Sequence, residues 1–103
     1  MIGPVATHRD EIAALCRRFH VRRLELFGSA ARGADFDPAT SDVDFLVEFD
    51  PTHRLHAFDD YFGVKEGLEA LLGRRVDLVV EKAVRNPYFR ATIDRTRQPV
   101  YAA

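Results

Sequence analysis

The sequence predicts an α/β (α+β) fold in which a small mixed β-sheet is packed by helices. Short apolar runs rich in β-branched and aromatic residues are typical of strands, and longer segments repeat apolar residues at helical spacing. The chain has 103 residues, 47% of them hydrophobic, and a formal net charge of −1. We therefore expect one domain over residues 1–103, with no basic excess to favour direct nucleic-acid binding.

The first expected helix begins near Thr7, because Thr7-His8-Arg9-Asp10 resembles a capping box. Apolar residues follow at i, i+3, i+4 and i+7 spacing: Ile12, Leu15, Cys16 and Phe19. A single cysteine cannot form an internal disulfide, so we expect Cys16 to be a buried thiol. The first strand, Leu24-Glu25-Leu26-Phe27, comes next.

The second strand, Phe45-Leu46-Val47, is followed by a polar loop and a helix from about Phe58 to Leu72. Gly63 and Gly67 are expected to weaken this helix by up to about 1 kcal/mol each relative to alanine. Its apolar side is predicted to contain Phe58, Tyr61, Phe62, Leu68, Leu71 and Leu72. Gly73 ends the helix, and the third strand lies within Arg75–Val80.

The last segments predict a helix and an edge strand. Asn86-Pro87 has N-cap and first-turn chemistry. Gln98–Tyr101 is expected to form a short edge strand or an extended tail, because Pro99 excludes a central strand. The aromatic residues Tyr61, Phe62, Tyr88 and Phe89 are expected to pack in the core, with contact to a partner as the alternative.

Two carboxylates open the second strand. Side chains at i and i+2 share one face of a strand, so Asp42 and Asp44 point the same way. Two carboxylates held this close repel each other and raise each other's pKa, which Mg²⁺ relieves. The alternative is that Asp42 is a turn or cap residue and Asp44 a solvated residue on the outer face.

A glycine-serine pair follows the first strand. Gly28 permits a positive φ, and Ser29 precedes a short helix, Ala30-Ala31-Arg32, whose N-terminal N–H groups suit a phosphate. We expect the Gly28 backbone and the Ser29 hydroxyl to hold such a group. Ser29 can equally be an ordinary N-cap and Gly33 an ordinary helix-terminating residue. Arg32 either reaches a phosphate or pairs with a nearby acid.

A third carboxylate, Asp77, interrupts the third apolar run. A charge in such a run requires a partner or a metal, and Asp77 can face Asp42 and Asp44 if the third strand lies beside the second. The alternative is an ion pair with Arg74 or Arg75. Bringing these groups together requires the first and second strands to be antiparallel and the second and third to be parallel.

Together, Gly28-Ser29, Arg32-Gly33, Ser41-Asp42-Val43-Asp44 and the later Asp77 resemble the DNA polymerase β-like nucleotidyltransferase superfamily, over about Thr7 to Val80. The small size is similar to its minimal nucleotidyltransferase (MNT) group. The resemblance implies that Asp42, Asp44 and Asp77 hold two Mg²⁺ ions, with Asp77 as a potential general base. It also implies that Gly28 and Ser29 hold the triphosphate of ATP. Asp35 and Asp37 are expected to be solvated loop residues.

The resemblance also implies a partner. Many MNT proteins are antitoxins paired with a HEPN-domain RNase toxin, and active ones transfer AMP from ATP to a tyrosine of that toxin. One alternative is an antitoxin that neutralises its toxin by binding alone. Another is a nucleotidyltransferase with a small-molecule acceptor, although such enzymes usually carry a second domain. Both homo- and hetero-oligomers are compatible with the sequence.

The sequence contains no apolar run long enough to span a membrane and no visible signal peptide, which favours a cytoplasmic protein. The four histidines show no metal-ligand pattern; they are His8, His20, His53 and His56.

Overall fold

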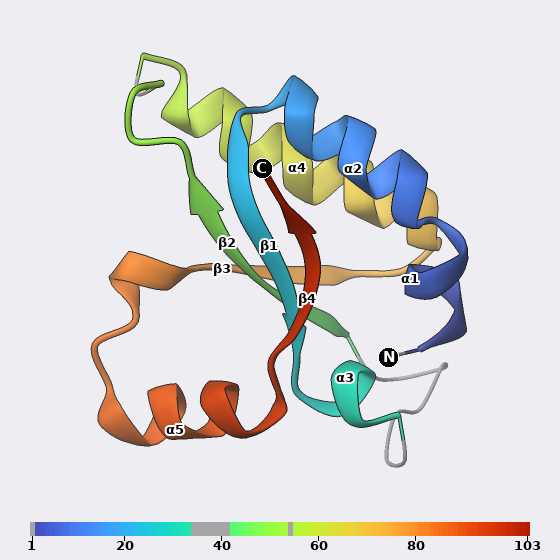
Figure 1. Ribbon diagram of the computed structural model, residues 1–103, viewed down its shortest axis with the longest axis vertical. Coiled ribbons are helices and arrows are strands. Elements are labelled where there is room, and N and C mark those ends of the chain that lie inside the picture. The colour runs from blue at the N-terminus through green and yellow to red at the C-terminus, as the bar shows by residue number, and fades with distance from the viewer. Residues whose placement is uncertain (1, 34–41, 54) are drawn as a thin grey trace.

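The computed structural model describes residues 2–33, 42–53 and 55–103. Its centre is a mixed four-stranded sheet in the order β3-β2-β1-β4, with helices packed against it (Figure 1). The strands are β1 (Val21–Phe27), β2 (Val43–Phe49), β3 (Val76–Val80) and β4 (Gln98–Ala102). The helices are α1 (Gly3–Thr7), α2 (Arg9–Arg18), α3 (Ser29–Arg32), α4 (Ala57–Leu72) and α5 (Pro87–Thr96), with a 3₁₀ turn, η1 (Glu81–Ala83).

The predicted strand pairings are confirmed. β1 is antiparallel to β2, with Phe27 opposite Asp44, and β2 is parallel to β3, with Asp44 opposite Asp77. β4 pairs antiparallel with β1 at the edge of the sheet, which is where Pro99 can be accommodated. This register places the end of β1 and the starts of β2 and β3 at one end of the sheet.

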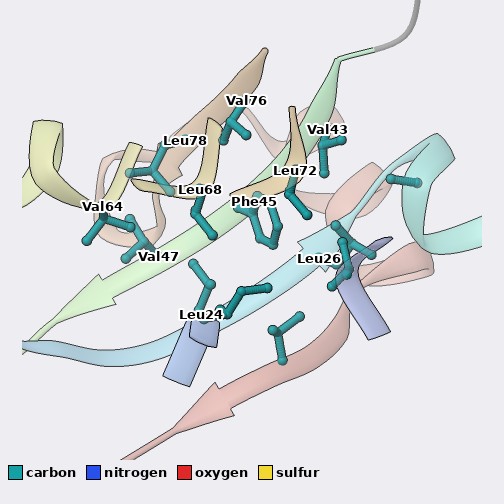
Figure 2. Packing of buried hydrophobic residues seen from close by; sticks show 14 of the residues in the cluster. Leu24, Leu26, Val43, Phe45, Val47, Val64, Leu68, Leu72, Val76 and Leu78 are labelled. Carbon is teal, nitrogen blue, oxygen red and sulfur yellow. The ribbon is translucent and has the colours of Figure 1, made fainter. Parts of the chain in front are cut away.

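Helices α2 and α4 cover one face of the sheet and form the main core with it. Alternate residues of the central strands point into this core, among them Leu24, Leu26, Phe45 and Val47 (Figure 2). Cys16 is buried there as expected, and burial raises the pKa of its thiol to about 12. A thiol with this pKa stays protonated and acts as a small apolar residue.

The opposite face of the sheet carries a smaller apolar cluster under α5. Phe27, Leu46 and Ile93 are its buried members. The α5 helix begins as predicted, because the Asn86 side chain accepts hydrogen bonds from the backbone N–H groups of Tyr88 and Phe89. Asp44, Leu46 and Asp77 lie on this same face because they occupy alternate or opposite positions of β2 and β3.

The predicted capping box at Thr7 is wrong. Pro4 lies in the first turn of a separate short helix, α1, which uses Thr7 as its last residue. His8 becomes the N-cap of α2 and makes no side-chain capping hydrogen bond; its Nδ1 lies 2.8 Å from the carbonyl of Pro4.

The predicted apolar side of α4 is only partly correct. Its buried residues are Asp60, Val64, Leu68 and Leu72, whereas Phe58 is 75% exposed. Gly63 and Gly67 face α2: a Cβ atom added to Gly63 would lie 2.3 Å from the Phe19 ring, and one added to Gly67 would lie 2.5 Å from Leu15. Close packing at these glycines therefore rotates the Phe58 side of the helix toward solvent.

The expected core packing of the four aromatic residues holds for Tyr61, which packs against the main core and donates a 2.6 Å hydrogen bond to the carbonyl of Leu78. It is wrong for Tyr88, which is 84% exposed, and for Phe62 and Phe89, which keep large exposed surfaces. Within the described ranges, none of the helices combines the length and apolarity needed to cross a membrane.

Candidate functional site

The turn between β1 and α3 makes the closest backbone approach in the site. Gly28 has φ 73° and ψ −151°, a conformation that L side chains rarely adopt. A Cβ atom at this position would lie 2.7 Å from Oδ2 of Asp44. Glycine is therefore required both for the bend and to let the Asp44 carboxylate come close to the backbone.

The Gly28 N–H does not face a ligand. It donates a 2.9 Å hydrogen bond to Oγ1 of Thr96, at the end of α5, while the Gly28 carbonyl accepts from the amides of Ala31 and Arg32. In this structure the amide is engaged by Thr96, so what Gly28 contributes to the site here is its conformation; its contact with a phosphate stays a prediction. Ser29 is the first residue of α3, and its hydroxyl makes no hydrogen bond to the described residues.

Asp44 lies half-buried at the start of β2. Burial, followed by the negative charges of Asp77 and Asp42, raises the pKa of its carboxyl to about 6. The strand register places Asp77 opposite Asp44, and Asp42 precedes Asp44 by two residues, so the three predicted acids lie at the same end of the sheet. No hydrogen bond or ion pair to Asp44 or Asp77 comes from residues 2–33, 42–53 or 55–103.

The predicted alternative for Asp77 was an ion pair with Arg74 or Arg75, and among the described residues Asp77 pairs with neither. Arg75 instead pairs with Asp42, its Nε lying 3.3 Å from Oδ1. Both of these side chains are substantially exposed, so the pair is weak and can exchange with solvent. Asp77 itself is an exposed residue in an otherwise apolar strand.

The donor set of the site fits a hard divalent cation. All three side chains are carboxylates, which suit Mg²⁺, and burial together with the charges of Asp77 and Asp42 raises the pKa of Asp44. As the side chains are placed, the described residues contain no group of three or more His, Cys, Asp or Glu arranged to hold a metal ion. Metal binding would therefore require the Asp42 carboxylate to leave Arg75.

The remaining predicted site residue, Arg32, is the last residue of α3 and is exposed, one helical turn from Ser29. Gly33 follows it in the left-handed conformation, as expected for a helix-terminating glycine. Asp35, Asp37 and Ser41 lie outside the described residues.

Thr96 was not identified by the sequence reasoning. It is separated from Gly28 by 68 positions, and its hydroxyl is one of several on α5. The helix could be predicted from Asn86-Pro87, but no local pattern says which of its residues meets the β1–α3 turn.

A cavity of about 410 Å³ lies at the other end of β2. Phe49, Tyr61 and Val80 are among its lining residues. Asp44 precedes Phe49 by five strand positions, or roughly 16 Å of extended chain. The three acids at the start of β2 and β3 therefore do not line this cavity.

Comparison with known proteins gives consistent results. Residues 10–99 match the family model described as "Nucleotidyltransferase domain". The chain is 36% identical over 97 residues to protein adenylyltransferase MntA of Thermococcus cleftensis, covering 94% of this chain and 87% of the relative. It is 39% identical over 77 residues to a "Putative protein adenylyltransferase" of Methanocaldococcus jannaschii, covering 75% of this chain and 74% of the relative.

Solved structures share the fold. One, described as a "putative minimal nucleotidyltransferase", has a TM-score of 0.72 and 35% identity, and the match covers 91% of this chain and 90% of that one. A chain of a toxin–antitoxin complex with AMP-PNP has a TM-score of 0.67 at 20% identity, covering 92% of this chain and 73% of that one. The second likeness concerns the fold alone.

The fold and the family model indicate the same protein family. The mixed sheet with helices matches the minimal nucleotidyltransferase fold, and the family model spans nearly the whole chain. The chain belongs to the nucleotidyltransferase domain family and is a minimal nucleotidyltransferase homologous to the MntA-type protein adenylyltransferases.

Proposed function

We propose that this chain, as one nucleotidyltransferase domain over residues 1–103, transfers AMP from ATP to a partner protein in a Mg²⁺-dependent reaction. The observation that carries the proposal is the approach of the Gly28 backbone to the Asp44 carboxylate, beside Asp77. A phosphate-accepting turn and a set of metal-binding carboxylates must meet in this way for a metal-bound triphosphate to span both.

Each proposed site residue has a role that its position supports. Asp42, Asp44 and Asp77 provide carboxylate oxygens for two Mg²⁺ ions, and the Ser29 hydroxyl and the start of α3 hold the triphosphate. The acceptor oxygen would form a bond to the α-phosphorus as the bond to the β-phosphate breaks and pyrophosphate leaves. Bound Mg²⁺ would lower the pKa of the attacking hydroxyl and neutralise charge on the leaving pyrophosphate. Asp77, whose exposed position supports this role, would accept the proton of that hydroxyl. Arg32 would contact a phosphate from the end of α3.

We further propose that the acceptor is a tyrosine of a HEPN-domain toxin, for which this chain is the antitoxin. The named relative MntA is a protein adenylyltransferase, and chains of the same fold occur in MntA–HepT toxin–antitoxin complexes. Exposed aromatic residues on α4 and α5 provide apolar surface for such a partner; they are Phe58, Phe62, Tyr88 and Phe89.

The test is to incubate the purified chain with ATP, Mg²⁺ and a candidate HEPN protein, and to measure the intact mass of both chains. The expected result is a gain of AMP units on the HEPN protein, which is lost with EDTA and with Asp44→Asn. The matched control is Asp59→Asn, which changes an exposed aspartate on α4 and should leave transfer unchanged.

Each other outcome points to a different function. A stable complex with no mass change on either chain would contradict transfer and favour an antitoxin that acts by binding alone. Full transfer by Asp44→Asn would overturn the assignment of the acidic site. Absence of both transfer and complex, with ATP consumed in the presence of a small hydroxylated acceptor, would favour a small-molecule nucleotidyltransferase.

A further inference from the structure

The β1–α3 turn is held by a helix that lies far from it in sequence. The Gly28 N–H donates to Oγ1 of Thr96 at 2.9 Å. The Thr96 hydroxyl in turn lies 3.2 Å from the carbonyl of Thr92 and 3.4 Å from that of Ile93, to which it can donate. A hydroxyl can donate one hydrogen bond and accept others, so Thr96 links the turn directly to the backbone of α5.

A second contact connects α5 to the same turn. Phe89, the third residue of α5, packs edge-on against Phe27 with ring centroids 5.9 Å apart. Phe27 is the last residue of β1 and directly precedes Gly28. The two ends of α5 therefore contact consecutive residues at the exit of β1, one through an aromatic pair and one through a hydrogen bond.

The end of α5 is itself firmly held. Arg97, the residue after Thr96, donates to Glu25 on β1, to Glu81 on η1 and to Asp94 on α5. These hydrogen bonds fix the backbone at Thr96 relative to the sheet. If the Gly28 turn moved away from Asp44, it would therefore lose its hydrogen bond to the Thr96 hydroxyl, which is held in place at the end of α5.

We propose that Thr96 is a positioning residue for nucleotide binding: it holds the Gly28–Ser29 turn against Asp44, so that the phosphate-binding and metal-binding halves of the site stay together. Gly28 is the residue through which it acts, because this hydrogen bond ties the positive-φ backbone of Gly28 to α5. The inference rests on the proposed function for the role of the turn, but the contact itself does not.

The test is Thr96→Val, which keeps the shape of the side chain but replaces the acceptor oxygen with a methyl group. That methyl cannot approach an amide nitrogen to 2.9 Å. The expected result is about a tenfold rise in the dissociation constant of ATP with Mg²⁺, and in the KM for ATP, with kcat changed much less. The Gly28 amide should also lose its protection from hydrogen exchange. Thr96→Ser, which keeps the hydroxyl, should restore both.

The matched control is Thr92→Val, one turn earlier on the same helix. Its hydroxyl bonds only to the carbonyl of Tyr88 and to Arg95, among the described residues, so this variant should bind ATP like the wild type. An unchanged ATP affinity together with a protected Gly28 amide in Thr96→Val would overturn the proposal. If the wild type binds no ATP, the proposed function fails, while amide exchange still shows whether Thr96 holds the turn.

Discussion

At the scale of single residues, Asp44 carries a charge that the fold disfavours. Its ordinary pKa of 3.8 is raised to about 6, first by burial and then by Asp77 and Asp42. The folded protein therefore binds this proton more tightly than the unfolded chain does. It follows that the free energy of unfolding decreases as the pH rises from about 4 to about 6, through the contribution of Asp44. A bound cation would offset this unfavourable negative charge, which supports a metal-binding role for Asp44.

We predict that Asp44→Asn stabilises the metal-free protein above pH 6, because it removes the buried charge. At pH 7.5 in EDTA, the free energy of unfolding measured by urea denaturation should rise by about 1–2 kcal/mol, allowing for solvent screening of a half-buried group. Addition of Mg²⁺ should raise the melting temperature of the wild type but not of the variant, because only the wild type retains the metal site.

Two controls sharpen this prediction. Glu66→Gln, at an exposed position in the middle of α4, should have the same stability as the wild type under both conditions. The melting temperature of the wild type in EDTA should also fall between pH 4.5 and 6.5 relative to that of Asp44→Asn. A variant that is less stable than the wild type at pH 7.5 without metal would contradict the electrostatic account.

At the scale of secondary-structure elements, glycines determine how α2 and α4 pack. Glycine in a helix interior costs up to about 1 kcal/mol relative to alanine, and both Gly63 and Gly67 were expected to weaken α4 for this reason. In the structure, the absence of side chains at these glycines lets the two helices pack closely: Phe19 and Leu15 of the α2 segment fill the space where Cβ atoms would lie. The interface between these helices thus depends on the missing side chains.

We predict that Gly63→Ala destabilises the protein by about 1–2 kcal/mol, despite the better helix propensity of alanine, because the Phe19 ring would have to move. Gly67→Ala should be close to neutral, since the Leu15 methyl groups at that site can change rotamer. Urea denaturation of both variants measures the difference. Adding Phe19→Leu to Gly63→Ala should recover part of the loss; equal stability of Gly63→Ala and the wild type would show that the helices can separate without cost.

Features set by residues close together in the chain could be predicted from the sequence, whereas most features set by distant residues could not. The strands could be predicted from periodicity, a signal that lies within a few residues. Their pairing could be predicted because the site requires Asp42 and Asp44 to meet Asp77, which lies in a later strand. The start of α5 was predictable because Asn86-Pro87 caps it locally. The exposed position of Phe58 depends instead on helix packing at Gly63. The contact of Thr96 with Gly28 joins segments 68 positions apart, which no local pattern encodes.

At the scale of the whole molecule, a group of charged residues joins elements that are distant in sequence. Arg97 donates from its Nε to Oε2 of Glu25 at 3.1 Å, and its other nitrogens reach Glu81 and Asp94. Burial alone would raise the pKa of Glu81, but hydrogen bonds from Arg23 and Arg97 outweigh it and lower that pKa. The stabilisation from Glu81 is thus present above its ordinary pKa of 4.5 and is lost as the pH falls below it.

We predict that Arg97→Met destabilises the protein by about 3 kcal/mol, because it leaves the Glu25 carboxylate, on a residue only 7% exposed, without its main partner. The double variant Glu25→Leu/Arg97→Met should be more stable than Arg97→Met, since no uncompensated charge is then buried. Arg95→Met is the matched control, because Arg95 contacts only Thr92 among the described residues and should be close to neutral. Urea denaturation of the wild type, Glu25→Leu, Arg97→Met and the double variant gives the coupling energy of the Arg97–Glu25 pair. A double variant that is less stable than Arg97→Met would contradict this interpretation. It would show that Glu25 stabilises the protein even without Arg97, so that Arg97 does more than compensate a buried charge.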